Sequence, residues 1–228
     1  MRAPDFSYCP ELERAMSAER FVGASGKVFE GRGPCSTPNN LAVIRAYMLE
    51  RKPARTLEVG LCFGASALAF AASHTGRHVA IDPYQRTTWD SVGLLAIERA
   101  GLADRFEFRD GPSSVELARA VGAGERYDFI YVDGSHLFED VFVDAYFGAR
   151  LLTEGGIMAF DDCTNPHVAK VLRFIRRGMP GLAEADLSAW RTDGVRTRAA
   201  RLLGRSQLVA FRRKGEIERP WDARFTPF

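Results

Sequence analysis

The sequence lacks most of the features that would place it in a special class of protein. Its 4 cysteines form no CxxC pair and lie far apart, at positions 9, 35, 62 and 163. We therefore expect reduced thiols in a cytoplasmic protein, not a disulfide framework or a zinc site. No apolar run approaches the length that crosses a bilayer, and the opening MRAPDFSYCPELERAM lacks the basic-then-apolar order of a signal peptide. A membrane partner is not expected.

The sequence also lacks an excess of either charge. Its 31 basic and 29 acidic residues leave a net charge of +2, which is too small to indicate a nucleic-acid partner. Two basic clusters, at 173–178 and 211–215, are interpreted as solvated faces. There is no internal repeat and no low-complexity segment. With 46% hydrophobic residues over a length of 228, the chain can bury a substantial core.

Short apolar runs alternate regularly with amphipathic segments from residue 55 onward. Strands are expected at 55–61, 78–84, 105–111, 127–134 and 155–162, and helices at 64–73, 92–102, 114–121, 137–152 and 167–178. This order predicts an α/β fold, a Rossmann-like doubly wound sheet whose strands are mostly parallel. Two later strands, at 187–192 and 207–213, have no long helix between them. They are expected to form an antiparallel pair at one edge.

The two ends of the chain differ from this pattern. Residues 1–54 are expected to form a helical and irregular lead-in, or lid, in which Thr37-Pro38 begins a helix that Pro53 ends. Residues 55–228 are expected to form one globular domain. The aromatic, proline-rich tail at 217–228 is expected either to pack on the body or to reach a neighbouring subunit. A homo-oligomer is therefore left open.

An acidic residue ends each of the five predicted parallel strands. In chain order these are Glu58, Asp82, Asp110, Asp133 and the pair Asp161-Asp162. The carboxyl ends of parallel strands meet at one edge of a sheet, where ligands bind. Buried acids are costly unless they meet hydrogen-bond donors or cations. One such acid would be interpreted as a helix cap, whereas five together predict a site.

The segment LEVGLCFGAS (57–66) is the candidate cofactor loop. Gly60 and Gly64 allow a tight turn and close approach of the backbone to a ligand. Asp82 lies 22 residues after Gly60, the spacing of an acid that binds ribose hydroxyls. The dinucleotide fingerprint would require glycine in place of Cys62. S-adenosylmethionine, which has a ribose but no pyrophosphate, is therefore favoured, and an NAD-type oxidoreductase remains the alternative.

The ordered set LEVGLCFGAS, AIDPY, RDGPSS, FIYVDGSHLFEDVFVD and LLTEGGIMAFDD resembles the class I S-adenosylmethionine-dependent methyltransferases. Among these it is most similar to small-molecule O-methyltransferases of the macrocin O-methyltransferase-like kind, over residues 55–165. The resemblance implies a seven-stranded sheet whose last strand is antiparallel. It also implies a transferase that methylates a hydroxyl of a small molecule, either a natural-product sugar or a catechol-like ring.

The resemblance further implies which residues contact the cofactor. Asp82 would hold the ribose hydroxyls, and Asp133 would also border the cofactor. The methionine portion of the cofactor would be surrounded by Glu58, Gly60, Gly64 and Ser66. The adenine would be bordered by Gly111, Pro112 and Ser113. Family members often have the sequence Gly-Asp-Ser where this chain has Gly111, Pro112 and Ser113. Pro112 cannot donate a main-chain hydrogen bond there.

Asp133, Asp161 and Asp162 end neighbouring strands, so their carboxylates can converge. Such groups repel one another unless a cation holds them, and oxygen ligands favour Mg²⁺ or Ca²⁺ over zinc. The resemblance implies a divalent ion that grips the acceptor hydroxyls. His136 is then expected as the general base beside Asp133. A cap role for Asp133, a structural role for His136 and a non-catalytic cofactor-binding module remain as alternatives.

Overall fold

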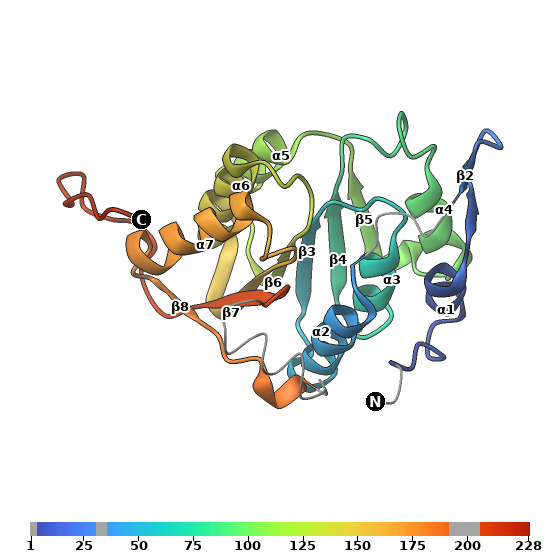
Figure 1. Ribbon diagram of the computed structural model, residues 1–228, viewed down its shortest axis with the longest axis horizontal. Coiled ribbons are helices and arrows are strands. Elements are labelled where there is room, and N and C mark those ends of the chain that lie inside the picture. Colours follow the sequence, from blue (N-terminus) through green and yellow to red (C-terminus); the bar gives the residue numbers. More distant parts are fainter. Residues whose placement is uncertain (1–3, 31–35, 192–205) are drawn as a thin grey trace.

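A seven-stranded sheet forms the centre of the computed structural model, which describes residues 4–30, 36–191 and 206–228 (Figure 1). The strand order is β5-β4-β3-β6-β7-β9-β8. The strands are β3 (Arg55–Val59), β4 (Arg77–Ile81), β5 (Phe106–Arg109), β6 (Tyr127–Val132), β7 (Leu152–Phe160), β8 (Leu182–Glu184) and β9 (Val209–Arg213). β3 pairs in parallel with both β4 and β6, so the strand order reverses at β3. β9 is antiparallel to β7 and to β8. The predicted mostly parallel sheet with an antiparallel last strand is confirmed.

Helices cover both faces of the sheet and create two hydrophobic cores. One core joins β4, β6 and β7 to α1 (Pro10–Ser17), α2 (Pro38–Arg51), α3 (Ala65–Ala71) and α4 (Val92–Arg99). The other lies under α5 (Ser113–Gly122), α6 (Phe138–Leu151) and α7 (Pro166–Gly178). Strand β6 shows the division, because Phe129 and Tyr131 enter the first core whereas Ile130 and Val132 enter the second. The predicted doubly wound architecture is therefore present.

The N-terminal region contains more than the expected helical lead-in. Thr37 caps α2 by accepting a hydrogen bond from the Asn40 amide, as the Thr-Pro signal predicted. Before it, β1 (Arg20–Val22) and β2 (Val28–Glu30) form an antiparallel hairpin that the sequence analysis did not foresee. Leu12 and Leu41 lie in the same core as α3. The division of the chain at residue 54 stays a prediction.

The expected strand at 187–192 is wrong. Ser188–Trp190 form a 3₁₀ turn instead, and the edge strand β8 lies earlier in the chain. The Asp186 carboxylate accepts hydrogen bonds from both the amide and the hydroxyl of Ser188, which favours a turn over an extended strand. Trp190 is buried and donates its indole hydrogen to Glu50 on α2. Residue 192 lies outside the described residues.

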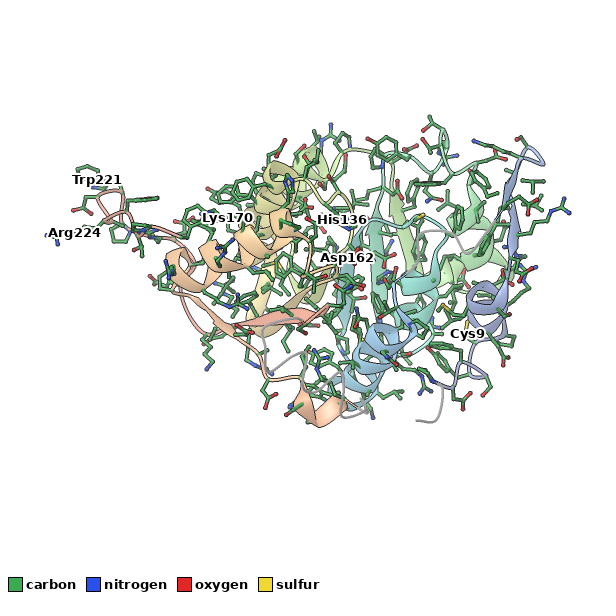
Figure 2. The ribbon with its side chains drawn as sticks, in the orientation of Figure 1. Cys9, His136, Asp162, Lys170, Trp221 and Arg224 are labelled. Carbon is green, nitrogen blue, oxygen red and sulfur yellow. The ribbon has the colours of Figure 1, made fainter. Side chains whose placement is uncertain are left out.

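The C-terminal tail packs against α7 at both of its ends. Arg219 donates to the main-chain oxygen of Gly178, and Lys170 donates to that of Phe228 at 2.6 Å. Between these anchors the tail projects from the molecule, and its Trp221 is 98% exposed (Figure 2). Lys170 is thus engaged by the tail. Within the described residues no helix is long and apolar enough to span a membrane. The cytoplasmic location stays a prediction.

Candidate active site

A cavity of about 850 Å³ opens beyond the carboxyl ends of β3, β4, β6 and β7. Its walls come from the loops that follow these strands, together with Ser36 and Thr37 at the start of α2. Parallel strands β4 and β6 flank β3, where the strand order reverses. This is the position at which open α/β sheets bind ligands. The cavity therefore lies where the sequence predicted a site.

The glycine loop forms the floor of the cavity in a strained conformation. Gly60 and Gly64 have φ angles of 93° and 85°, which favour glycine. A side chain at Gly60 would collide with the main-chain oxygen of Asp133. Cys62 also has a positive φ of 45° and lines the cavity. The loop thus brings the end of β3 into direct contact with the end of β6.

Asp82, the expected ribose ligand, lines the cavity and also organises the glycine loop. Its Oδ2 accepts hydrogen bonds from the amides of Leu61 (3.1 Å) and Cys62 (2.8 Å). Its Oδ1 accepts one from the amide of Tyr84 at 2.7 Å. Both carboxylate oxygens therefore fix the backbone on which a cofactor would rest. Contact between Asp82 and a ribose remains a prediction.

Unlike Asp82, three of the predicted cofactor residues do not line the cavity. Glu58 is fully buried beneath it, with Oε1 3.5 Å from His78 Nε2, and burial raises the pKa of its carboxyl. His78 in turn contacts the Thr56 hydroxyl at 2.8 Å. Gly64 and Gly111 are the other two, whereas Pro112 and Ser113 do border the cavity. The acid that ends β5, Asp110, forms an ion pair with Arg86 outside it.

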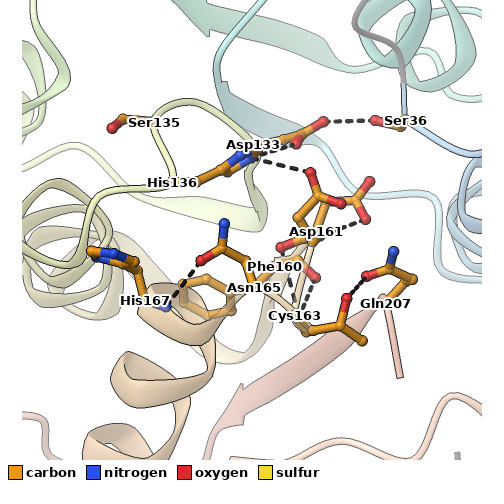
Figure 3. Close-up of polar contacts among 12 residues, drawn as sticks. Ser36, Asp133, Ser135, His136, Phe160, Asp161, Cys163, Asn165, His167 and Gln207 are labelled. Atoms are coloured by element: carbon orange, nitrogen blue, oxygen red, sulfur yellow. Dashed lines mark hydrogen bonds and ion pairs between the residues drawn. The ribbon is translucent and has the colours of Figure 1, made fainter. Parts of the chain in front are cut away.

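Asp133, His136 and Asp162 come together at one wall of the cavity. Figure 3 shows the Asp133 and His136 side chains of this group next to each other. His136 Nε2 lies 3.2 Å from Asp162 Oδ2 and 3.9 Å from Asp133 Oδ1. One potential ligand atom from each residue lies within 4.8 Å of the other two. Asp162 has a φ of 49°, an unusual conformation for an aspartate in which its side chain meets His136.

The charges of the three residues depend on one another. Burial raises the pKa of the Asp133 carboxyl, and the charge of Asp162 raises it further, against the opposing effects of His136 and Ser36. The nearby Asp133 raises the pKa of the His136 imidazole, which the carboxylates of Asp162 and Asp161 raise further. The two carboxylates thus favour a positive charge between them.

Asp161 follows the same strand but belongs to a separate hydrogen-bond network. Asn40 donates to its Oδ1 at 2.6 Å, and the Tyr131 hydroxyl donates to its Oδ2. Ser36, 3.1 Å from the Tyr131 hydroxyl, donates to Asp133 Oδ2 at 2.7 Å and so links this network to Asp133. Burial, with the nearby Asp133 carboxylate, raises the pKa of Asp161 to about 6. The metal role predicted for Asp161 therefore remains a prediction, with both oxygens already engaged.

The network includes residues that the sequence analysis missed. Ser36, Asn40 and Tyr131 carried no motif, because a serine, an asparagine and a tyrosine near a helix start or inside a strand are ordinary. Only the helix that begins at Thr37 gave a signal. Phe138 and Phe142 are partly buried against the second core. His167 accepts a hydrogen bond from the Phe138 amide.

The donor set fits a divalent cation. Two carboxylates and an imidazole face one another, and the cost of burying Asp133 would be offset by a cation. Carboxylate oxygens suit Mg²⁺ and Ca²⁺, whereas an imidazole also suits other divalent metals. Asp133 and Asp162 are thus the carboxylates that would hold a metal without any rearrangement of the Asp161 network, with His136 beside them.

Residues 57–163 match the family described as "Methyltransferase domain". Over these residues, which make up less than half of the chain, the sequence is similar to methyltransferase domains. Among curated proteins it is 33% identical over 117 residues to caffeoyl-CoA O-methyltransferase 2 of Petunia hybrida, covering 47% of this chain and 45% of that one. It is 31% identical over 112 residues to caffeoyl-CoA O-methyltransferase 1 of Eucalyptus globulus, covering 47% and 44%. The matched region spans less than half the length of these relatives.

Solved structures extend the likeness beyond the methyltransferase domain. An O-methyltransferase from Bacillus cereus in complex with SAH aligns with a TM-score of 0.64 at 17% identity, covering 90% of this chain and 91% of that one. TomG from Streptomyces achromogenes, an O-methyltransferase in complex with SAM, aligns at 0.62 and 16%, covering 79% and 82%. At such identities the likeness concerns the fold. The class I S-adenosylmethionine-dependent methyltransferase resemblance is confirmed.

Proposed function

We propose that the protein transfers a methyl group from S-adenosylmethionine to a hydroxyl of a small molecule. The observation that carries this proposal is the position of Asp133, His136 and Asp162 in the large cavity of a methyltransferase domain. Metal-assisted O-methylation requires groups that hold a cation and a base near the acceptor. All three residues are of the types that such a reaction uses.

The floor and one wall of the cavity are suited to the cofactor. S-adenosylmethionine would supply a methyl group activated by its positively charged sulfur. Gly60 and the exposed backbone of the loop admit close approach, and Ser66 lies at the start of the following helix. Asp82 and Pro112 border the same space. We propose these residues, together with Ser113, as the cofactor site.

Asp133 and Asp162 are proposed to hold Mg²⁺, with His136 as the general base. The cation would lower the pKa of an acceptor hydroxyl bound to it. His136 borders the cavity with 40% of its side chain exposed, so it can reach both the carboxylates and an acceptor. An imidazole is suited to accept the hydroxyl proton near neutral pH. Asp161 would support the site by holding Tyr131 and the start of α2 in place.

The NAD-type oxidoreductase finds less support in the cavity. The backbone at Cys62 adopts a positive φ and the residue lines the cavity, where the dinucleotide fingerprint requires glycine. A non-catalytic cofactor-binding module would not need the strained Asp162 facing His136. The cluster therefore favours catalysis over binding alone.

Calorimetry and turnover assays test the proposal together. The protein should bind S-adenosylmethionine in preference to NAD, and the variant Asp82→Ala should bind it more weakly than the wild type. Methyl transfer to a panel of catechols and sugars should require Mg²⁺ and stop with a chelator. Preference for NAD would reject the methyltransferase proposal. Transfer that a chelator does not affect would reject only the metal.

A further inference from the structure

The β1–β2 hairpin forms a two-stranded sheet of its own, separate from the central sheet (Figure 1). Each of its strands has three residues. A hairpin of this size is not stable in water by itself, so its conformation depends on what it packs against. Its two faces differ, because Val22 and Val28 are exposed whereas Phe21 and Phe29 are partly buried. The phenylalanine face is therefore the one that attaches the hairpin to the protein.

The rings of Phe21 and Phe29 pack on two loops that shape the cavity. Phe63 follows the cavity residue Cys62 in the glycine loop and is 3% exposed. Its ring centroid lies 4.6 Å from that of Phe21 and 5.3 Å from that of Phe29. Trp89, in the loop between β4 and α4 (residues 82–91), lies 5.6 Å from Phe63 and 6.4 Å from Phe29. One aromatic cluster thus joins the hairpin to both loops.

The turn of the hairpin also holds the β4–α4 loop in a strained backbone conformation. Asp90 and Ser91 are consecutive residues with φ angles of 46° and 61°, which favour glycine. The main-chain oxygen of Asp90 accepts a hydrogen bond from the Ala24 amide at 2.8 Å, and its Oδ2 accepts one from the Ser25 amide at 3.0 Å. A side chain at Gly23 would collide with Asp90. Such conformations persist where surrounding contacts hold them, and the hairpin supplies these contacts at Asp90.

Both loops belong to the cofactor side of the cavity. Gly60 and Cys62 of the glycine loop border it, as do Asp82 and Trp89 at the two ends of the β4–α4 loop. Gln85 joins the two loops directly, because its Nε2 donates to the main-chain oxygen of Cys62 at 2.6 Å. None of the hairpin residues 20–30, all of which the structure describes, borders the cavity. The hairpin can therefore affect a bound cofactor only through the loops.

We propose that the hairpin raises the affinity of the protein for S-adenosylmethionine by holding the glycine loop and the β4–α4 loop together, with Phe21 and Phe29 as positioning residues. This inference rests on the proposed methyltransferase function and adds residues outside the cavity to its cofactor site. The two phenylalanines act through Phe63 and Trp89. By linkage, a cofactor that binds more tightly when the hairpin is docked also holds the hairpin in its docked position.

Calorimetry with S-adenosylhomocysteine tests this inference without an acceptor. Phe29→Ala removes the ring that contacts both Phe63 and Trp89, and it should raise the Kd by roughly tenfold. A role confined to stability would lower the number of binding-competent molecules and leave the Kd unchanged, so the fitted stoichiometry and Kd separate the two roles. Phe29→Leu keeps an apolar side chain in the cluster and should give an intermediate Kd. It also provides the test if Phe29→Ala does not fold.

Val28→Ala is the matched control, because Val28 precedes Phe29 in the same strand and its side chain is exposed. It should keep the wild-type Kd. Hydrogen exchange supplies the reciprocal measurement, in which S-adenosylhomocysteine should slow exchange of the amides in residues 20–30 of the wild type.

Equal Kd values for the wild type and both Phe29 variants would overturn the inference. So would a rise in Val28→Ala as large as that in Phe29→Ala, or hairpin exchange that S-adenosylhomocysteine leaves unchanged in the wild type. A wild-type protein that does not bind S-adenosylhomocysteine would instead reject the proposed function itself.

Discussion

Asp161 and Asp162 are neighbours in the sequence, yet their side chains lie in two different surroundings. Asp161 is buried and receives hydrogen bonds from Asn40, Tyr131 and the Asp162 amide. The Asp162 side chain is 45% exposed and faces His136. We propose from this difference that Asp161 maintains the architecture of the site while Asp162 is presented to a ligand. Five strand-end acids therefore do not amount to five ligands.

The largest effect that tests this comparison is expected when the His136 imidazole is removed. His136→Ala should lower kcat by roughly 100-fold, the contribution expected of a general base, while the affinity for S-adenosylhomocysteine stays unchanged. Steady-state turnover and calorimetry measure the two quantities. His167→Asn is the control, since it keeps an acceptor for the Phe138 amide and lies outside the cavity. Full activity of His136→Ala would dismiss the base.

The two neighbouring acids should differ in their effect on stability. Asp161→Ala leaves the buried Asn40 amide and Tyr131 hydroxyl without their acceptor, which should cost about 3 kcal/mol in the free energy of unfolding. Asp162→Asn should change it by less than about 0.5 kcal/mol, because asparagine tolerates the positive φ of 49° at this position. Urea unfolding at pH 7 with a chelator measures both. Equal costs would contradict the division into structural and ligand-facing carboxylates.

A third carboxylate, Asp144 on α6, sharpens the comparison because it is buried. Burial raises the pKa of its carboxyl to about 7, against the opposing effect of the nearby Ser113 hydroxyl. The folded state therefore holds the proton more tightly than the unfolded state, so this contribution to stability is present at low pH and is lost as the pH rises through 7. Between pH 5 and 8 the loss should be about 2–3 kcal/mol.

Asp144→Asn should abolish this part of the pH dependence, because the amide does not titrate. Unfolding curves in urea at several pH values would show a flatter profile for the variant than for the wild type. An unchanged profile in Asp144→Asn would assign the pH dependence to other groups and contradict the raised pKa.

The smallest effect is expected at the tip of the N-terminal hairpin. Asp90 accepts hydrogen bonds from the amide and hydroxyl of Ser25, and the loop that contains it carries the cavity residue Trp89. Asp90→Ala should therefore raise the Kd for S-adenosylmethionine by roughly twofold, as expected from one exposed polar contact. Thr87→Ala, on the same loop but without a contact to the hairpin, is the control. Equal affinities of Asp90→Ala and the wild type for S-adenosylmethionine would show that the hairpin does not support the site.

Much of the fold could be predicted because the signals were repeated and regular. The alternation of apolar runs with amphipathic helices fixes β3 to β7 and α3 to α7 within a few residues. The failures have local causes. The strands of the N-terminal hairpin have three residues each, which is too short for a periodic signal. At Ser188 a turn held by Asp186 replaces the expected strand, and burial of Trp190 against α2 orients it.

The site could be predicted in part for a similar reason. The convergence of Asp133, His136 and Asp162 follows from strand topology, which the sequence indicates. Whether each carboxylate is held in a buried hydrogen-bond network or faces the cavity depends on partners that lie far away in the sequence. Asn40 is 121 residues from Asp161, and Ser36 is 97 residues from Asp133. No pattern in a single sequence relates such residues to one another.

The central claim is that Asp133, His136 and Asp162 form the centre at which cation and acceptor meet. The most direct measurement is a calorimetric titration of Mg²⁺ into the protein saturated with S-adenosylhomocysteine, for the wild type and for Asp162→Asn. The account predicts one bound ion in the wild type and an affinity at least about tenfold weaker in the variant. Equal Mg²⁺ affinity in the two proteins, or no binding to the wild type, would contradict it.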